Sequence, residues 1–384
     1  MARISLRKIF RHILGCSMVF CLLCSLWSST ISSPQIPPGI KTIRIAGERE
    51  ILAGDVAPRG DFLAFITAGK NGHTLFILNL KTGLIQKIEG IRKRARACRW
   101  DGNDTLWFEK EDSKGNFTVW CWKDDVAKAS PLPIGAWRPV PSPDGKYVAF
   151  LSGIQGGLSI LDASTKRIQK IPANYVSTYG FTPEGKFFVF IRMSSDQSMK
   201  NLPLGIPIPQ NQGEVAIIRV PNWGKVKVID KGALLRPIRI SFLKNADFVF
   251  LKKEISSLSS PPPLPKTPQE AKTGELAGSK FILYERARQW QAKVIWKEKY
   301  VNDMFAVSSD GKFLLVPCLL SQGNPNQVVL KLVNLSTKQE RNVGEVADLK
   351  DLFFNEARKS FVVISSQKIF YLTLDGKRID IITR

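Results

Sequence analysis

Histidine is the scarcest chemically useful residue in this chain, which has two among 384 residues. His12 lies near the N-terminus, and His73 lies in the loop KNGHT. A metal centre needs several ligands, and histidine is the commonest of them in proteins. A histidine-rich metal centre is therefore excluded, and we interpret His73 as an ordinary polar loop residue.

Catalytic signatures are lacking as well. The chain has no G-x-S-x-G turn, no H-E-x-x-H helix, no pair of C-x-x-C motifs and no phosphate-binding G-K-[ST] loop. Each of these places a nucleophile, a metal ligand or a phosphate at a fixed spacing. The sequence therefore predicts no catalytic residue, no metal site and no cofactor.

The apolar run ILGCSMVFCLLCSLW, from Ile13 to Trp27, has about 15 residues, whereas a membrane-spanning helix needs about 20. It follows a basic stretch without acidic residues, an order typical of secretion signals. We predict that residues 1–33 are a cleaved signal peptide, with a retained anchor through residues 13–27 as the alternative. The protein is then exported, to the periplasm, cell envelope or extracellular space.

A module of about 30 residues stands in the middle of the chain. It reads SPDGKYVAFLSGIQGGLSILDASTKRIQKI, from Ser142 to Ile171. The turn formers SPDG are followed by a short apolar run, a glycine-rich break, a second apolar run and another turn. This pattern predicts three short β-strands joined by tight turns.

The same pattern recurs along the chain. Clear copies begin at Pro58, Pro183 and Ser309, and weaker ones at Asp101, Lys244 and Glu356. Most copies start roughly 40 to 47 residues apart, and the gap widens to about 60 to 65 around the fourth and fifth. A period near 40 residues with four strands per repeat is typical of a β-propeller blade.

The stretches SPDGKYVAFLSG and GGLSILDASTKR resemble the WD40-like repeat of TolB-type propellers. This resemblance implies an all-β fold, a single β-propeller over residues 34–384. We predict seven four-stranded blades, with six as the alternative number. We also expect the segment IKTIRIAGE, from Ile40, to add an outer strand that helps to close the ring.

The resemblance also bears on catalysis. It extends to the propellers of prolyl-oligopeptidase-like enzymes, whose chemistry lies in an attached hydrolase domain. Propeller-type polysaccharide lyases instead gather histidines around a metal, which two histidines do not allow. Because the repeats run to the last residue, Arg384, we expect that the chain is not an enzyme.

The cysteines are expected to be free. Three of the six, Cys98, Cys121 and Cys318, lie outside the N-terminal segment. Cys98 is predicted in the first strand of a blade and Cys121 in the third, about two strand spacings apart and beyond disulfide reach. We interpret all three as small buried hydrophobic residues.

Positive charge dominates the composition, with 56 Lys and Arg against 33 Asp and Glu and a formal net charge of +23. The run IRKRARACRW concentrates this charge at the entry to the second blade, together with a tryptophan. We predict a binding face made of Arg92, Lys93, Arg94, Arg96, Arg99 and Trp100. Because unpaired arginines are costly to bury, we expect Arg94 and Arg96 to line the channel mouth.

Tryptophans gather in the same blade, at Trp100, Trp107, Trp120 and Trp122, and Trp137 begins the next. Large aromatic side chains fill the space between propeller blades, and they also stack on sugars or bases beside cations. We favour core packing over a stacking platform for these residues.

Two long loops interrupt the repeats, at residues 193–214 and 252–280. Both fall between the second and third strands of their blades, and the second contains SSPPPLPKTP. Such loops emerge on the same face as the connections between blades. We therefore expect the loops and the basic run to share a face.

These observations leave three hypotheses for function. The favoured one is an exported, monomeric, non-catalytic scaffold that binds a protein partner in the cell envelope through its long loops. The alternative is a binder of an anionic polymer, such as acidic glycan, nucleic acid or lipid headgroups, through the basic face. The third is an enzyme with an unrecognised site in the channel.

Overall fold

The computed structural model describes residues 42–383 apart from several gaps. The description leaves out single residues or pairs at 46, 89–90, 92, 131, 154–155, 174, 299–300 and 302–303, and longer stretches at 194–211, 234–239, 254–278 and 320–325. The predicted signal segment, residues 1–33, and most of both long loops lie outside the described residues. In the part that is described, no helix has the length and apolarity to cross a bilayer.

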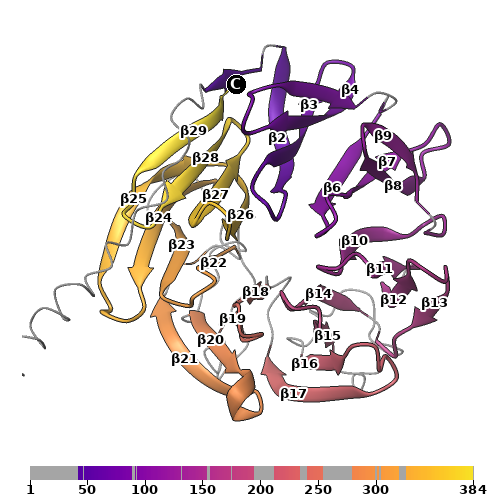
Figure 1. Cartoon of the computed structure of the whole chain (residues 1–384). Coiled ribbons are helices and arrows are strands. Elements are labelled where there is room, and N and C mark those ends of the chain that lie inside the picture. Colours follow the sequence, from indigo (N-terminus) through magenta and orange to yellow (C-terminus); the bar gives the residue numbers. More distant parts are fainter. Residues whose placement is uncertain are drawn as a thin grey trace, which may run out of the picture. The chain divides into compact units, whose positions relative to one another are not determined.

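Seven four-stranded antiparallel sheets follow one another along the chain and form a ring, which confirms the all-β propeller and fixes the number of blades at seven (Figure 1). Blade 1 consists of β2 (Glu48–Val56), β3 (Phe62–Gly69), β4 (Gly72–Asn79) and β5 (Ile85–Ile88). Blade 2 consists of β6 (Ala95–Trp100), β7 (Leu106–Glu111), β8 (Phe117–Lys123) and β9 (Val126–Ala129). Blade 3 consists of β10 (Trp137–Pro141), β11 (Tyr147–Ser152), β12 (Gly157–Asp162) and β13 (Ile168–Lys170). Blade 4 consists of β14 (Val176–Phe181), β15 (Phe187–Met193), β16 (Gln212–Arg219) and β17 (Val226–Ala233), and blade 5 of β18 (Ile240–Phe242), β19 (Phe248–Lys253), β20 (Ser279–Glu285) and β21 (Gln291–Glu298). Blade 6 consists of β22 (Ala306–Val307), β23 (Phe313–Leu319), β24 (Gln327–Asn334) and β25 (Glu340–Ala347). Blade 7 consists of β26 (Leu349–Asn355), β27 (Ser360–Ser365), β28 (Lys368–Thr373) and β29 (Arg378–Thr383).

Each blade takes its four strands from one continuous stretch of the chain, and a fifth strand from the start of the propeller joins blade 7. All four strands of blade 1 come from the start of the propeller, and all four of blade 7 come from its end. The short strand β1 (Ile43–Arg44) pairs in parallel with β29, the outer strand of blade 7. This confirms the extra outer strand expected from the segment at Ile40. On the turn side, Arg358 of blade 7 donates two hydrogen bonds to the carbonyl of Gly60 in blade 1.

The repeated turn owes its shape to its serine and glycine. In blade 3 the Ser142 hydroxyl donates to Asp144 and accepts a hydrogen bond from the amide of Tyr147. Gly145 has φ +68°, in the left-handed region that glycine enters at no steric cost. Side-chain bonds of this kind replace the backbone pairing that a tight turn cannot make, which is why the motif recurs between first and second strands.

The core lies between the blades. The second strands are buried on both faces, as in β3, where Leu63, Ala64, Phe65 and Ile66 are fully buried. The outer strands are exposed, as in β13. A strand that packs on both faces reads as a continuous apolar run, and this explains the short apolar runs of the repeat.

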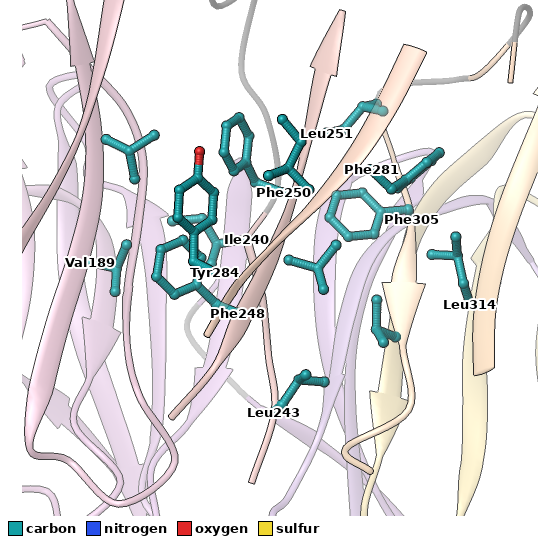
Figure 2. Packing of buried hydrophobic residues seen from close by; sticks show 14 of the residues in the cluster. Val189, Ile240, Leu243, Phe248, Phe250, Leu251, Phe281, Tyr284, Phe305 and Leu314 are labelled. Carbon is teal, nitrogen blue, oxygen red and sulfur yellow. The ribbon is translucent and has the colours of Figure 1, made fainter. Parts of the chain in front are cut away.

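Figure 2 shows this packing around blade 5, within a cluster of buried hydrophobic residues that reaches into blades 4 and 6. The ring of Tyr284 stacks on that of Phe248 at 5.0 Å and on that of Phe250 at 5.3 Å, and Phe305 of the connection to blade 6 packs edge-on against Phe281. Offset aromatic stacks of this kind add about 0.5–1.5 kcal/mol per pair beyond area burial.

The hairpin between the second and third strands lies on the same side as the connection to the next blade. In blade 1 the backbone amide of His73 donates to the carbonyl of Lys93, at the entry to blade 2. The His73 ring nitrogen Nδ1 lies 2.8 Å from the carbonyl oxygen of Ala95. Both long loops begin after a second strand, β15 and β19, and end at a third strand, β16 and β20. The basic run and the ends of these loops therefore share a face, as expected.

Candidate functional site

The innermost strands of five blades carry a β-bulge, an extra residue that turns the following side chains. In β6 the register shifts between Arg96 and Cys98, and Ala97 has φ +51°. In β10 it shifts between Trp137 and Val140, and Arg138 has φ +54°. A positive φ is unusual for these residues, so neighbouring groups must stabilise it.

These bulged strands surround a cavity of about 880 Å³ around the ring axis, here called the central cavity. Its walls are formed by Pro58, Ala97, Arg99, Trp100, Gly102, Arg138, Pro139, Val140, Pro141, Ser142, Pro143, Thr178, Tyr179, Gly180, Phe181, Pro183, Ile240, Phe242, Met304, Lys350 and Asp351. The cavity reaches the turns between first and second strands, on the face opposite to the long loops. Its volume lies within the range of small-molecule sites.

Arg138 is the best-anchored cation in the central cavity. Its backbone amide donates to the carboxylate of Glu109 in blade 2, and its carbonyl accepts a hydrogen bond from the hydroxyl of Tyr179 in blade 4. Its guanidinium donates to the carbonyl of Ser177 at 2.9 Å and lies 5.8 Å from the Tyr179 ring centre. Among the described residues no salt bridge joins a carboxylate to this guanidinium, although its charge works against the burial that raises the pKa of the nearby Glu109 carboxyl.

Glu109 is the residue that stabilises this arrangement. Its side chain is fully buried and also accepts a hydrogen bond from Nε of Arg96. Burial raises the pKa of the Glu109 carboxyl, and the bonds from Arg96 and from the Arg138 amide offset part of this effect. One buried carboxylate therefore joins the basic run of blade 2 to the bulge of blade 3.

The other charges of the central cavity are internally paired. Arg99 of blade 2 contacts the carboxylate of Asp351 in blade 7 at 3.4 Å. Burial acts to lower the pKa of Arg99, but Asp351 and Asp55 outweigh it and raise the pKa. Lys350 contacts Asp348 at 2.9 Å and Glu50 at 3.5 Å. These ion pairs link blade 7 to blades 1 and 2 near the channel.

The predicted binding face is divided by the structure. Arg99 and Trp100 line the central cavity, and Arg92 lies outside the described residues. Lys93 is exposed and donates to the carbonyl of Ser113. Neither Arg94 nor Arg96, which were expected to line the channel mouth, borders the central cavity.

The bulge at Ala97 changes the facing of the residues that follow it. Regular alternation from Arg96 would have turned Cys98 toward the channel, whereas with the extra residue Arg99 borders the central cavity. Arg94 instead pairs with Glu111 at 2.9 Å. The Arg96 guanidinium pairs with Glu109 and lies 3.8 Å from the ring centre of Phe117.

The tryptophans pack in the core, as favoured from the sequence. Trp100, Trp107 and Trp122 are each 6% exposed, and the rings of Trp100 and Trp122 meet edge to face. Trp120 packs, partly buried, against the same cluster as Trp122. In the described part of the chain Cys98, Cys121 and Cys318 are free, as predicted; Cys98 and Cys121 are buried, whereas Cys318 is only partly buried, and burial raises the pKa of its thiol to about 11. In the part of the chain that is described, no group of three metal-ligating side chains comes together.

Sequence reasoning missed Arg138 and Asp351. Neither belongs to a charge cluster or a known motif, since Arg138 stands alone in AWRPVPSPDG. The available signal was position: both residues lie four before the first residue of a repeated turn, at Ser142 and Asn355. Counting back from the turns therefore identifies inner-strand residues better than counting charge does.

No family model matches this chain, and no curated protein matches it in sequence. In structure it is similar to the tricorn protease, at 11% identity and TM-score 0.58 over 86% of this chain and 35% of that one. It is also similar to a prolyl endopeptidase, at 12% identity and TM-score 0.59, over 87% of this chain and 50% of that one. A third similar structure is the β-propeller domain of the Trilobed protease from Pyrococcus furiosus, which has an open velcro topology. Its identity is 11% and its TM-score 0.56, over 87% of this chain and 98% of that one.

At these identities the likeness establishes the β-propeller fold alone. The chain spans about a third of the tricorn protease and half of the prolyl endopeptidase. The hypothesis of a non-catalytic protein-interaction scaffold is nevertheless wrong as stated, because these similar propellers belong to peptidases. A propeller fold gives no ground for setting catalysis aside.

Proposed function

We propose that this propeller binds the carboxylate end of a peptide in its central cavity and serves a peptidase as its peptide-binding module. The observation that carries the proposal is Arg138, a guanidinium in a cavity of about 880 Å³ without a carboxylate partner in the described residues. Guanidinium pairs with carboxylate through two parallel hydrogen bonds, which gives both strength and orientation.

The fixed backbone conformation of Arg138 supports a binding role. Residues in strained backbone conformations persist only where their surroundings stabilise them, and such residues cluster at functional sites. Here Glu109 and Tyr179, from the two neighbouring blades, bond the amide and carbonyl of the strained residue. A cation whose backbone is fixed in this way loses little freedom when it meets its ligand.

The walls of the central cavity differ on its two sides. Arg99, Lys350 and Asp351 come from blades 2 and 7, whereas Phe181, Phe242 and Met304 come from blades 4, 5 and 6. Gly180 allows the Phe242 ring to approach, since a Cβ at that position would lie 2.7 Å from its Cε2 atom. A carboxylate at Arg138 therefore has an apolar wall beside it, which suits a peptide that ends in a bulky apolar residue.

The net charge of +23 favours the same class of ligand, because a cationic protein attracts anions over long range. Peptidases use propellers of this fold, and in this proposal hydrolysis takes place at a centre on another domain or chain. The finer likeness of the repeat to TolB-type propellers, and export through residues 1–33, remain part of the proposal.

The test is a comparison of two peptides by fluorescence anisotropy. An N-terminally labelled tripeptide ending in phenylalanine with a free carboxylate should bind at least tenfold more tightly than its C-terminal amide, since charged hydrogen bonds contribute about 1.5–3 kcal/mol. Arg138→Met should abolish that preference.

Arg167→Met, an exposed arginine in a turn of blade 3, is the matched control and should retain the preference. Equal binding of acid and amide by the wild-type protein would disprove the proposal. So would a preference that survives in Arg138→Met.

A further inference from the structure

A second cavity lies between blades 5 and 6, at the face that carries the turns between first and second strands. It has a volume of about 380 Å³ and is here called the wedge cavity. Its walls are Leu243, Lys244, Asn245, Asp247, Val249, Leu283, Lys293, Val294, Ile295, Val307, Ser309, Asp310, Gly311, Leu335, Ser336 and Lys338. None of these residues borders the central cavity, so the wedge cavity is a separate site.

The floor of the wedge cavity is apolar. Leu243, Val249 and Val307 are buried, and Leu283 and Leu335 pack against the same core cluster. Leu243 is labelled at the lower edge of that cluster in Figure 2. A volume of about 380 Å³ lies at the small end of the range for ligand pockets.

One wall residue is an exposed hydrophobic side chain. Val294 is 45% exposed in β21, where the register shifts between Phe281 and Ile282 of the paired strand. Val294 lines the wedge cavity and leaves apolar surface uncovered by the other described residues. Burial of such surface against a ligand is favourable by about 25 cal/mol per Å².

Lysines surround the rim. Lys293 is exposed and its side chain makes no hydrogen bond or ion pair with another described residue, and Lys338 donates to the carbonyl of Ile295 at 2.9 Å. Lys244 is paired with Glu356. The acidic wall residues are already occupied: Asp247 accepts from Arg286 and Asn245, and Asp310 accepts from Ser308.

We propose that the wedge cavity binds an amphiphile with a carboxylate head and an unbranched apolar chain, of the size of a medium-chain fatty acid. The apolar floor and Val294 receive the chain, and Lys293 and Lys338 meet the carboxylate at the rim. Lysine suits this position because its stem covers apolar surface while its ammonium stays in water. The site is independent of the peptide site at Arg138.

The experiment titrates the protein with dodecanoate below its micelle concentration by isothermal calorimetry, with dodecanol in parallel. Saturable 1:1 binding of dodecanoate is expected, with affinity at least fivefold above that of dodecanol. Val294→Glu should weaken dodecanoate binding at least tenfold, because it adds a carboxylate to the wedge cavity.

Two matched variants complete the design. Val126→Glu alters a valine that is 59% exposed outside the wedge cavity and should bind like the wild type. Lys293→Met with Lys338→Met should reduce dodecanoate affinity to that of dodecanol, whereas Lys297→Met should not. Absence of saturable binding, or equal effects of Val294→Glu and Val126→Glu, would overturn the proposal. Binding that requires an acidic apolar peptide and excludes dodecanoate would also overturn it.

Discussion

Blades 2 and 3 differ in whether their arginines are paired with carboxylates. Blade 2 has the densest run of positive charge in the sequence, yet Arg94, Arg96 and Arg99 each pair with a carboxylate. Blade 3 contributes a single arginine to the channel, and Arg138 has no carboxylate partner among the described residues. The number of charges in a sequence therefore says little about which charge is available to a ligand.

The first way to break this comparison is to remove the carboxylate that the two blades share. Glu109→Ala removes a fully buried acceptor and leaves the Arg138 amide without its hydrogen bond, whereas the Arg96 side chain is 51% exposed and can turn to water. We expect a loss of about 2 kcal/mol in unfolding free energy, measured by urea denaturation, because unsatisfied buried donors are costly.

Glu111→Ala is the matched control for this experiment. Glu111 pairs with Arg94, whose side chain is 60% exposed, and exposed pairs contribute little to stability. The stability of this variant should stay within error of the wild type. If both variants lost the same stability, Glu109 would have no special role in fixing Arg138.

The repeat architecture was accessible from sequence, because turn residues and apolar runs are local features. SPDG fixes a turn through Ser142 and Gly145, and strands buried on both faces appear as uninterrupted apolar runs. The aromatic core of blade 2 and the free thiols followed from the same reasoning.

The site was not accessible in this way. A bulge at Ala97 reverses the facing of every later residue in β6, and no local signal in ACRW marks it. The partner of Arg99, Asp351, is 252 residues away, so its neutralisation depends on ring closure. Pairing across a fold is a tertiary property, and one sequence does not reveal it.

The second prediction sharpens the comparison between paired and free cations. Lys93→Met combined with Arg94→Met removes two positive charges, yet the affinity for the free-acid peptide should change less than twofold, because neither residue borders the central cavity or contacts Glu109. Arg138→Met removes one charge and should cost at least tenfold. Anisotropy titrations at fixed ionic strength decide between these outcomes, and a larger loss in the double variant would contradict the assignment.

The third prediction concerns salt. If one guanidinium in a partly enclosed cavity makes the main charge contact, raising sodium chloride from 50 to 500 mM should weaken peptide binding by about tenfold or less. A face of many unpaired cations would lose far more affinity over the same range. Repeating the titration at four salt concentrations measures how steeply the peptide affinity falls with sodium chloride. A steep fall would contradict the assignment to Arg138 and would favour the basic face as the binding surface.

The smallest expected effect is a difference in pH dependence between two buried carboxylates. Burial raises the pKa of Glu109. Burial also acts on Glu214, but Arg192 and Lys231 outweigh it and lower the pKa of that carboxyl. The native state therefore takes up a proton at Glu109 more readily, and at Glu214 less readily, than the unfolded chain does.

The signs of the two effects follow from linkage. As pH falls from 7 toward the ordinary glutamate pKa of about 4.3, the wild type should gain stability relative to Glu109→Gln. As pH falls further through the lowered pKa, it should lose stability relative to Glu214→Gln. Thermal unfolding midpoints of the three proteins from pH 7 to pH 3 give both slopes, and slopes of the same sign would contradict the assignment.

The central claim is that Arg138 binds a peptide carboxylate inside the propeller. The most direct measurement is a crystal structure with a tripeptide that ends in 4-bromophenylalanine, in which anomalous scattering locates the bromine. We predict the carboxylate at the Arg138 guanidinium and the bromine beside Phe181 and Phe242. Bromine density on the surface of blade 2, beside Arg94 and Arg96, would contradict the account.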